Sequence, residues 1–123
     1  MRLIAAVDDL FFLARIRETA RQVGVPIETV PTARLEATLK EGLIGDSLKA
    51  VVLDLSSNGA VELIRALKTN PQTRPSWIVG FASHVATGLV AAARAAGCDQ
   101  VLARSAFTRQ LPDLLRSLAV TDQ

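Results

Sequence analysis

Three carboxylates stand at the ends of apolar segments, a position from which side chains can do chemistry. Asp8 and Asp9 follow the apolar run at 2–7, and Asp54 lies near the end of the run at 50–55. If both runs are strands of one parallel sheet, these acids meet at the carboxyl edge of that sheet, where ligands bind in open α/β folds. Converging carboxylates repel one another and need a divalent cation, a basic side chain or a proton. Because all the ligands would be oxygen atoms, the cation would be Mg²⁺.

Two arrangements of these acids require no metal ion. Arg104, just past the last apolar run, could bring a positive charge to the same edge. Asp8 and Asp9 could instead cap the helix that follows them, because the N-terminus of a helix favours negative charge. The residues alone leave the metal site, the ion pair and the helix cap open.

Apolar segments alternate with segments of helical period, and this pattern predicts an α/β fold. The expected strands are 2–7, 26–30, 50–55, 76–82 and 99–103, and the expected helices are 10–23, 33–42, 60–68, 86–96 and 107–118. Several of the strand segments are continuously apolar, which is typical of a parallel sheet covered on both faces. We expect a doubly wound five-stranded parallel sheet of order 2-1-3-4-5. Gly24 and Gly97 should end helices, and Pro112 favours a start of the last helix near Leu111 rather than Phe107.

Composition limits the classes of protein to consider. The 123 residues are half apolar and suit one domain, 1–123, with no output domain. The formal net charge is +2, and the basic residues are scattered, so a nucleic-acid partner is not expected. No apolar run approaches the roughly 18 residues of a membrane span, so no membrane contact is expected either. The single cysteine, Cys98, suits a reducing compartment, and the expected location is the cytoplasm.

The whole chain resembles the receiver domains of two-component response regulators. VDD at 7–9 resembles the acidic pair of that family, LDL at 53–55 the strand end with the phospho-accepting aspartate, and VLARSAF at 101–107 the segment with its invariant lysine. The resemblance implies Mg²⁺-dependent phosphotransfer to a carboxylate nucleophile, with Asp54 as the phosphoacceptor. The metal ligands that it implies are Asp8, Asp9, Asp54 and the backbone carbonyl of Ser56.

The residues expected to line this site depart from the family pattern. Arg104 stands in the lysine position, and its guanidinium is a planar group with several N–H donors, whereas the ammonium of lysine is a compact point charge. Ser105 replaces a proline that follows a cis peptide, so we expect a trans peptide here. Ala82 stands where the family has its switch hydroxyl, and Val101 replaces an aromatic residue. Ser83 has a hydroxyl one residue late, and it should point to the other face unless the strand has already ended.

Asp54 is therefore open to two interpretations: a phosphoacceptor, or a carboxylate neutralised by Arg104. The loop SSNG at 56–59 is shorter than the family's usual turn, which also argues against Mg²⁺ binding. Our working hypothesis is an atypical or pseudo-receiver with impaired or absent phospho-switching. It would be a stand-alone module that is not an enzyme and binds another signalling protein, either a histidine kinase or a downstream effector.

The sequence is also compatible with two alternative functions. The first is a functional Mg²⁺-dependent response regulator that is phosphorylated on Asp54. The second is a Mg²⁺-dependent phosphotransfer or hydrolytic enzyme, although the sequence has neither a P-loop nor a G-x-S-x-G motif.

Overall fold

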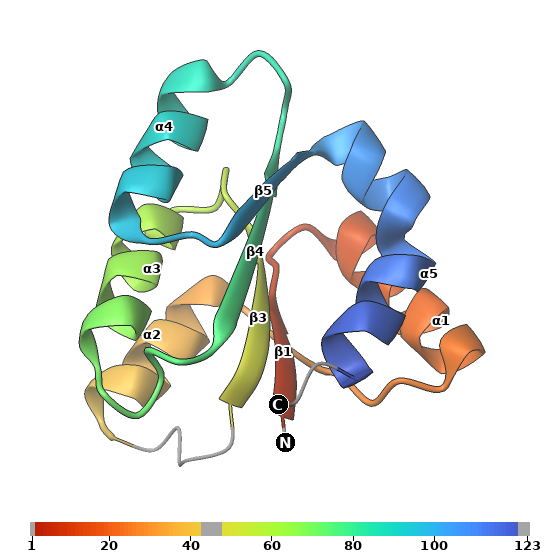
Figure 1. Ribbon diagram of the computed structural model, residues 1–123, viewed down its shortest axis with the longest axis horizontal. Helices are drawn as coiled ribbons and strands as arrows, with labels where there is room; N and C mark the ends of the chain where they lie inside the picture. Colours follow the sequence, from red (N-terminus) through yellow and green to blue (C-terminus); the bar gives the residue numbers. More distant parts are fainter. Residues whose placement is uncertain (1, 43–47, 121–123) are drawn as a thin grey trace.

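A parallel sheet forms the centre of the molecule, with helices on both of its faces (Figure 1). The computed structural model describes residues 2–42 and 48–120. The strands are β1 (Arg2–Ala6), β2 (Glu28–Val30), β3 (Leu48–Asp54), β4 (Trp77–Ala82) and β5 (Gln100–Ala103). The helices are α1 (Leu10–Val23), α2 (Thr32–Lys40), α3 (Ala60–Thr69), α4 (Thr87–Ala96) and α5 (Arg104–Val120). Within the described ranges, every helix is too short or too polar to cross a lipid bilayer.

The strand order is β2-β1-β3-β4-β5 with parallel pairing throughout, so the predicted topology is confirmed. In Figure 1, α2, α3 and α4 lie on one side of the sheet, and α1 and α5 lie on the other. The strands β1 and β3 are neighbours, as predicted from the sequence. The ends of these two strands therefore lie together at the carboxyl edge of the sheet.

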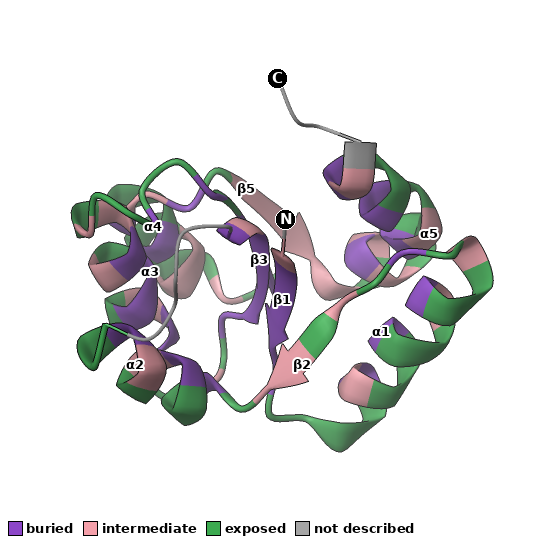
Figure 2. Cartoon of the chain, turned by 90° about the horizontal axis from the view of Figure 1, so that it is seen from below, coloured by how far each residue is buried: buried purple, intermediate pink, exposed green. Residues whose placement is uncertain are grey.

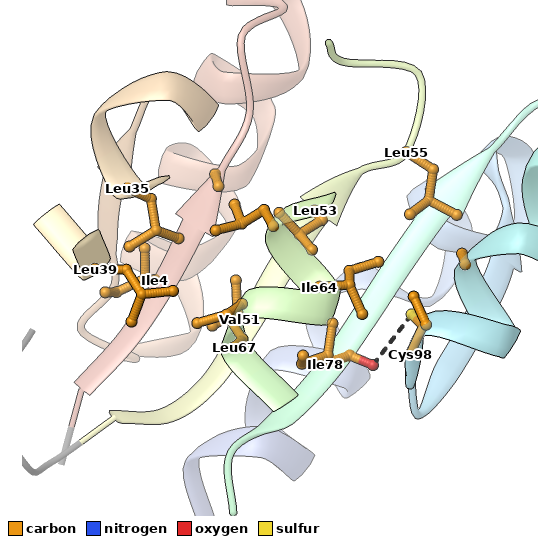
Figure 3. Close-up of a cluster of buried hydrophobic side chains, with 14 of the residues drawn as sticks. Ile4, Leu35, Leu39, Val51, Leu53, Leu55, Ile64, Leu67, Ile78 and Cys98 are labelled. Atoms are coloured by element: carbon orange, nitrogen blue, oxygen red, sulfur yellow. Dashed lines mark hydrogen bonds between the residues drawn. The ribbon is translucent and has the colours of Figure 1, made fainter. Parts of the chain in front are cut away.

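The hydrophobic core is divided by the sheet into two clusters. One cluster joins β1, β3 and β4 to α2, α3 and α4, and includes Ile4, Val51 and Ile64 (Figure 3). The other lies under α1 and α5 and includes Phe81 and Phe107. Because both faces of the central strands are covered, β1 and β3 are almost wholly buried, whereas β5 at the sheet edge is half-buried (Figure 2).

Cys98 packs as a small apolar residue at the entry to β5. Its side chain is 8% exposed, and its Sγ lies 3.5 Å from the carbonyl oxygen of Ile78 (Figure 3). Burial raises the pKa of the Cys98 thiol. The thiol is thus held in its protonated, less reactive form.

Two predicted helix ends are confirmed. Gly24 and Gly97 end α1 and α4 in the left-handed conformation, with φ of 73° and 112°. A side chain at Gly97 would also collide with α3, because an added Cβ would lie 2.8 Å from Cγ of Lys68. Position 97 therefore needs glycine for its backbone angle and for the space beside it.

The expected start of the last helix is wrong. The helix α5 begins at Arg104, directly after β5, and Pro112 lies inside it. An internal proline costs about 3 kcal/mol because it removes one hydrogen bond and crowds the preceding turn. Phe107, Leu111 and Leu115 are at most 1% exposed. The burial of this apolar face outweighs the cost of the proline, because each large side chain contributes roughly 1.5–3 kcal/mol.

The other differences from the expected elements are at their ends. The edge strand β2 pairs with β1 only over Glu28–Val30, and Pro26 has no N–H with which to extend the pairing. The second helix ends at Lys40, and Gly42 follows it with a φ of 72°. Such shifts of a few residues leave the carboxyl edge of the sheet where the sequence places it.

Candidate functional site

Asp54 is the last residue of β3 and lies beside Phe81 of β4. Its side chain is enclosed, and the residue is 4% exposed. One carboxylate oxygen, Oδ1, accepts hydrogen bonds from the backbone N–H and the hydroxyl of Ser56, at 3.0 and 2.7 Å. A buried carboxylate is stable only if donors or charges replace its water shell. The turn that follows β3 provides two of these donors.

Arg104 lies close to the same carboxylate oxygen. Its Nη2 atom is 3.8 Å from Oδ1 of Asp54, which is an ion-pair distance too long for a hydrogen bond. The Arg104 side chain is 40% exposed, but its Nε atom is buried and has no hydrogen-bond partner among the described residues. The guanidinium thus places positive charge beside Asp54 without forming the bidentate contact typical of arginine and carboxylate.

An aromatic cluster, formed by Phe12, Phe81 and Phe107, supports the Arg104 side chain. The guanidinium carbon lies 5.4 Å from the centre of the Phe12 ring, a cation–π distance. The rings of Phe81 and Phe107 are stacked with centres 4.2 Å apart, and Phe12 lies 5.1 Å from Phe81. Phe11 is 68% exposed, so only one of these two adjacent rings of α1 is buried.

Asp8 and Asp9 both contact the N-terminus of a helix. Asp9 caps α1, because its Oδ1 accepts hydrogen bonds from the N–H groups of Phe11 at 2.8 Å and Phe12 at 3.2 Å. Asp8 accepts a hydrogen bond of 2.8 Å from the N–H of Thr32, the first residue of α2. The suggestion that both acids cap α1 is therefore wrong for Asp8. The reason is that β1 and β2 are neighbours, which brings the start of α2 next to the end of β1.

The acids present do not fit a Mg²⁺ site in this arrangement. Within residues 2–42 and 48–120, no group of three or more His, Cys, Asp or Glu side chains is placed to hold a metal ion. Asp8 and Asp9 are directed to backbone N–H groups, and the N–H and hydroxyl of Ser56 are directed to Asp54. The three carboxylates that the resemblance implies as metal ligands are therefore not assembled around a common point.

Ala82, which the resemblance places in the switch position, gives the end of β4 no hydroxyl. Ala82 ends the strand and is 1% exposed. Ser83 follows the strand, and its hydroxyl accepts a weak hydrogen bond of 3.4 Å from the N–H of Val85. The strand has ended before Ser83, so the alternation of side chains along β4 does not apply to this residue. Together with Arg104 and His84 it lines an open pocket of about 320 Å³, in which Asp54 takes no part.

The first peptide bond of α5 has the trans form that the sequence predicts. The described chain has no cis peptide bond, so the bond between Arg104 and Ser105 is trans. Val101, in the position of the family's aromatic residue, is half-buried on β5. Position 101 therefore has no aromatic ring that could move in response to a change at Asp54.

Two features of the site were not predicted from the sequence. The first is the contact of Ser56 with Asp54. An Asp-x-Ser spacing directly after a strand could have indicated this contact, because an aspartate side chain often accepts a hydrogen bond from the residue two positions later. The second is the position of Phe12 under Arg104. No local signal predicts it, because it depends on the packing of α1 beside α5.

Comparisons with known proteins connect this arrangement to one fold. No model of a known protein family matches the chain, and no curated protein matches it. Among solved structures, a response regulator receiver domain from Rhodospirillum rubrum matches with a TM-score of 0.79 and 19% identity over 99% of this chain and 96% of that one. A response regulator from Hahella chejuensis matches with a TM-score of 0.81 and 17% identity over 99% and 97%.

A third match is the receiver domain of a sensor histidine kinase from Pseudomonas aeruginosa, which holds a magnesium ion in its active-site cleft. Its TM-score is 0.76, with 16% identity over 96% of each chain. The sheet order, the covering helices and these matches over nearly the full length agree. The chain therefore has the fold of the response regulator receiver domains.

Proposed function

We propose that this chain is a signalling module of the two-component type that acts by binding another protein and does not use the phospho-switch of receivers. The observation that carries the proposal is the environment of Asp54. One carboxylate oxygen accepts two hydrogen bonds from Ser56 and lies 3.8 Å from the Arg104 guanidinium. These contacts engage the lone pairs of Oδ1 and place a positive charge beside it. A carboxylate oxygen whose lone pairs are engaged in this way is a weaker nucleophile toward a phosphoryl group.

The second part of the proposal is that phosphorylation would have no route to the partner surface. A ligand shifts a conformational equilibrium only through contacts that differ between two states. In a phospho-switch of the family's kind, a hydroxyl moves toward the phosphoryl group and an aromatic ring follows. Ala82 and Val101 provide neither group. The proposed module therefore presents a constant surface.

The proposed partner is another signalling protein, either a histidine kinase or a downstream effector. The recognition surface that we propose is the face made by α4, β5 and α5. The strand β5 forms the edge of the sheet and is only half-buried, and the exposed residues of α4 include Ala91 and Ala95. In this proposal the chain catalyses no reaction and contacts neither nucleic acid nor membrane.

The first prediction concerns the response to phosphorylation. Amide NMR spectra of the wild type and of Asp54→Asn are recorded with beryllofluoride and Mg²⁺, and again with a small phospho-donor. We expect any wild-type shifts to remain near Asp54 and not to spread into residues 84–107. If shifts spread through 84–107 in the wild type alone, the chain is a working phospho-accepting regulator. Continuous release of inorganic phosphate would instead indicate an enzyme.

The second prediction concerns Mg²⁺. We expect no saturable change in the amide shifts of Asp9 and Asp54 at sub-millimolar Mg²⁺, because the acids are engaged elsewhere and Arg104 supplies positive charge. Arg104→Met should strengthen Mg²⁺ binding, because it removes that charge from beside Asp54. Saturable wild-type binding at sub-millimolar Mg²⁺ that Asp54→Asn abolishes would contradict the proposal.

A further inference from the structure

A second concave site lies at the amino ends of the strands, at the other end of the sheet from Asp54. It is formed by the first residues of β3, β4 and β5 and by the last turns of α5, and its volume is about 210 Å³. An apolar cavity of about 150 Å³ is large enough for benzene, whereas drug-sized molecules occupy about 300–1,000 Å³. This pocket therefore suits a single aromatic ring with a small substituent.

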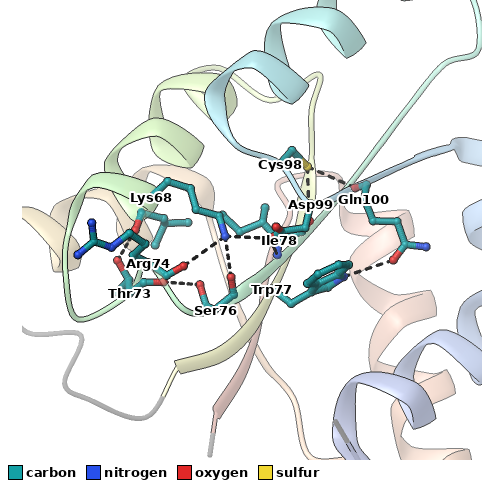
Figure 4. Close-up of polar contacts among 10 residues, drawn as sticks. Lys68, Thr73, Arg74, Ser76, Trp77, Ile78, Cys98, Asp99 and Gln100 are labelled. Atoms are coloured by element: carbon teal, nitrogen blue, oxygen red, sulfur yellow. Dashed lines mark hydrogen bonds and ion pairs between the residues drawn. The ribbon is translucent and has the colours of Figure 1, made fainter. Parts of the chain in front are cut away.

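The walls of the pocket suit a flat apolar group. Trp77, the only tryptophan of the chain, lines it and is 45% exposed. The indole N–H donates a long hydrogen bond of 3.4 Å to Oε1 of Gln100, so the two side chains lie together at the start of their strands (Figure 4). Leu114 and Leu118 of α5 also line the pocket. An aromatic ring would bury apolar surface against this indole and these leucines.

The pocket also holds a positive charge that no acid of the described residues neutralises. Lys49 lines it, and its ammonium donates one hydrogen bond of 2.7 Å to the carbonyl oxygen of Ala119. An ammonium group has three N–H donors, and among the described residues only one of those of Lys49 has an acceptor. Across residues 2–42 and 48–120, no carboxylate lies within 4.0 Å of the Lys49 ammonium, and no acidic residue lines the pocket. An anionic ligand would complete these contacts.

We propose that the chain binds a small aromatic carboxylate in this pocket, with the ring beside Trp77 and the carboxylate at Lys49. The carboxylate accepts charge-assisted hydrogen bonds from the ammonium, which the Ala119 carbonyl already holds in place. The ring fills the space between β4 and α5. This site is separate from Asp54, and it does not depend on the function proposed above.

The test uses benzoate as the probe and the fluorescence of the single tryptophan as the readout. We expect a saturable change in Trp77 emission, and amide shifts at Lys49, Gln100 and residues 114–118. Benzamide has nearly the same shape without the charge, and we expect it to bind at least tenfold more weakly. No saturation with benzoate, or equal binding of benzamide, would overturn the proposal. So would equally tight binding of toluene, which would identify the pocket as a site for apolar groups.

Substitution of the lysine gives an independent control. Lys49→Gln should weaken benzoate binding at least tenfold, whereas Lys49→Arg should retain most of it. Lys40→Gln, at an exposed lysine of α2, should leave benzoate binding unchanged. Equal benzoate affinities of Lys49→Gln and Lys40→Gln would overturn the assignment of the carboxylate to Lys49. The comparison of benzoate with benzamide on the wild type decides the question even if Lys49→Gln does not fold.

Discussion

Replacing Phe12 by alanine is expected to lower the free energy of unfolding by about 3–5 kcal/mol, as is usual when a large aromatic side chain is removed from a core. Phe12 is 8% exposed, and its ring packs 5.1 Å from that of Phe81 and 6.4 Å from that of Phe107. The substitution also removes the ring beneath the Arg104 guanidinium. Urea denaturation followed by circular dichroism measures the change.

The adjacent residue provides a matched control. Phe11 belongs to the same helix, but it is 68% exposed, so Phe11→Ala should change the free energy of unfolding by no more than about 0.5 kcal/mol. Equal effects at the two positions would show that the aromatic cluster does not stabilise the site.

The second large effect is expected at Asp99, at the entry to β5. Its Oδ2 atom accepts hydrogen bonds from the N–H of Ile78 at 2.8 Å and from the Lys68 ammonium at 2.9 Å (Figure 4). Lys68 also donates to the carbonyl oxygen of Ser76 at 2.9 Å. Asp99→Ala leaves a backbone N–H and an ammonium group without their acceptor. Each such loss in a partly buried site costs about 1–3 kcal/mol.

We therefore expect Asp99→Ala to destabilise the fold by about 2–3 kcal/mol. The Lys68 and Asp99 side chains are 20% and 24% exposed, so solvent screens part of their attraction and the effect should be smaller than for a fully buried pair. Asp113→Ala is the control, because Asp113 pairs with Arg116 on the surface and its side chain is 90% exposed. Its expected effect is no more than about 1 kcal/mol. A similar loss for both variants would contradict the structural role of the Asp99 contacts.

Most of the fold could be predicted from the sequence, because buried parallel strands and amphipathic helices leave strong periodic patterns. The run at 50–55 must be covered on both faces, and this requirement alone indicates a parallel sheet with helices on either side. The start of α5 could not be predicted in this way. The local penalty of Pro112 suggested a late start, but the packing of Phe107 and Leu111 against the sheet decides it.

The candidate site was predictable in position but not in detail. The strand ends placed Asp54 and Arg104 at the same edge, and the structure brings their side chains to 3.8 Å. The direction in which each carboxylate side chain points was not predictable, because it depends on which backbone N–H groups lie nearby. Asp8 contacts the start of α2, which is 24 residues away in the sequence, and only the sheet order brings the two together.

The pairing of Asp54 with Arg104 can be measured by a double-mutant cycle. The free energies of unfolding are measured for the wild type, Asp54→Asn, Arg104→Met and the double variant. Because Arg104 is 40% exposed, its attraction to the buried carboxylate is partly screened, and we expect a coupling energy of about 1–2 kcal/mol. A parallel cycle of Asp54→Asn with Arg116→Met should be additive. If the Asp54–Arg104 cycle is also additive to within about 0.5 kcal/mol, Arg104 does not neutralise Asp54, which contradicts the proposed function.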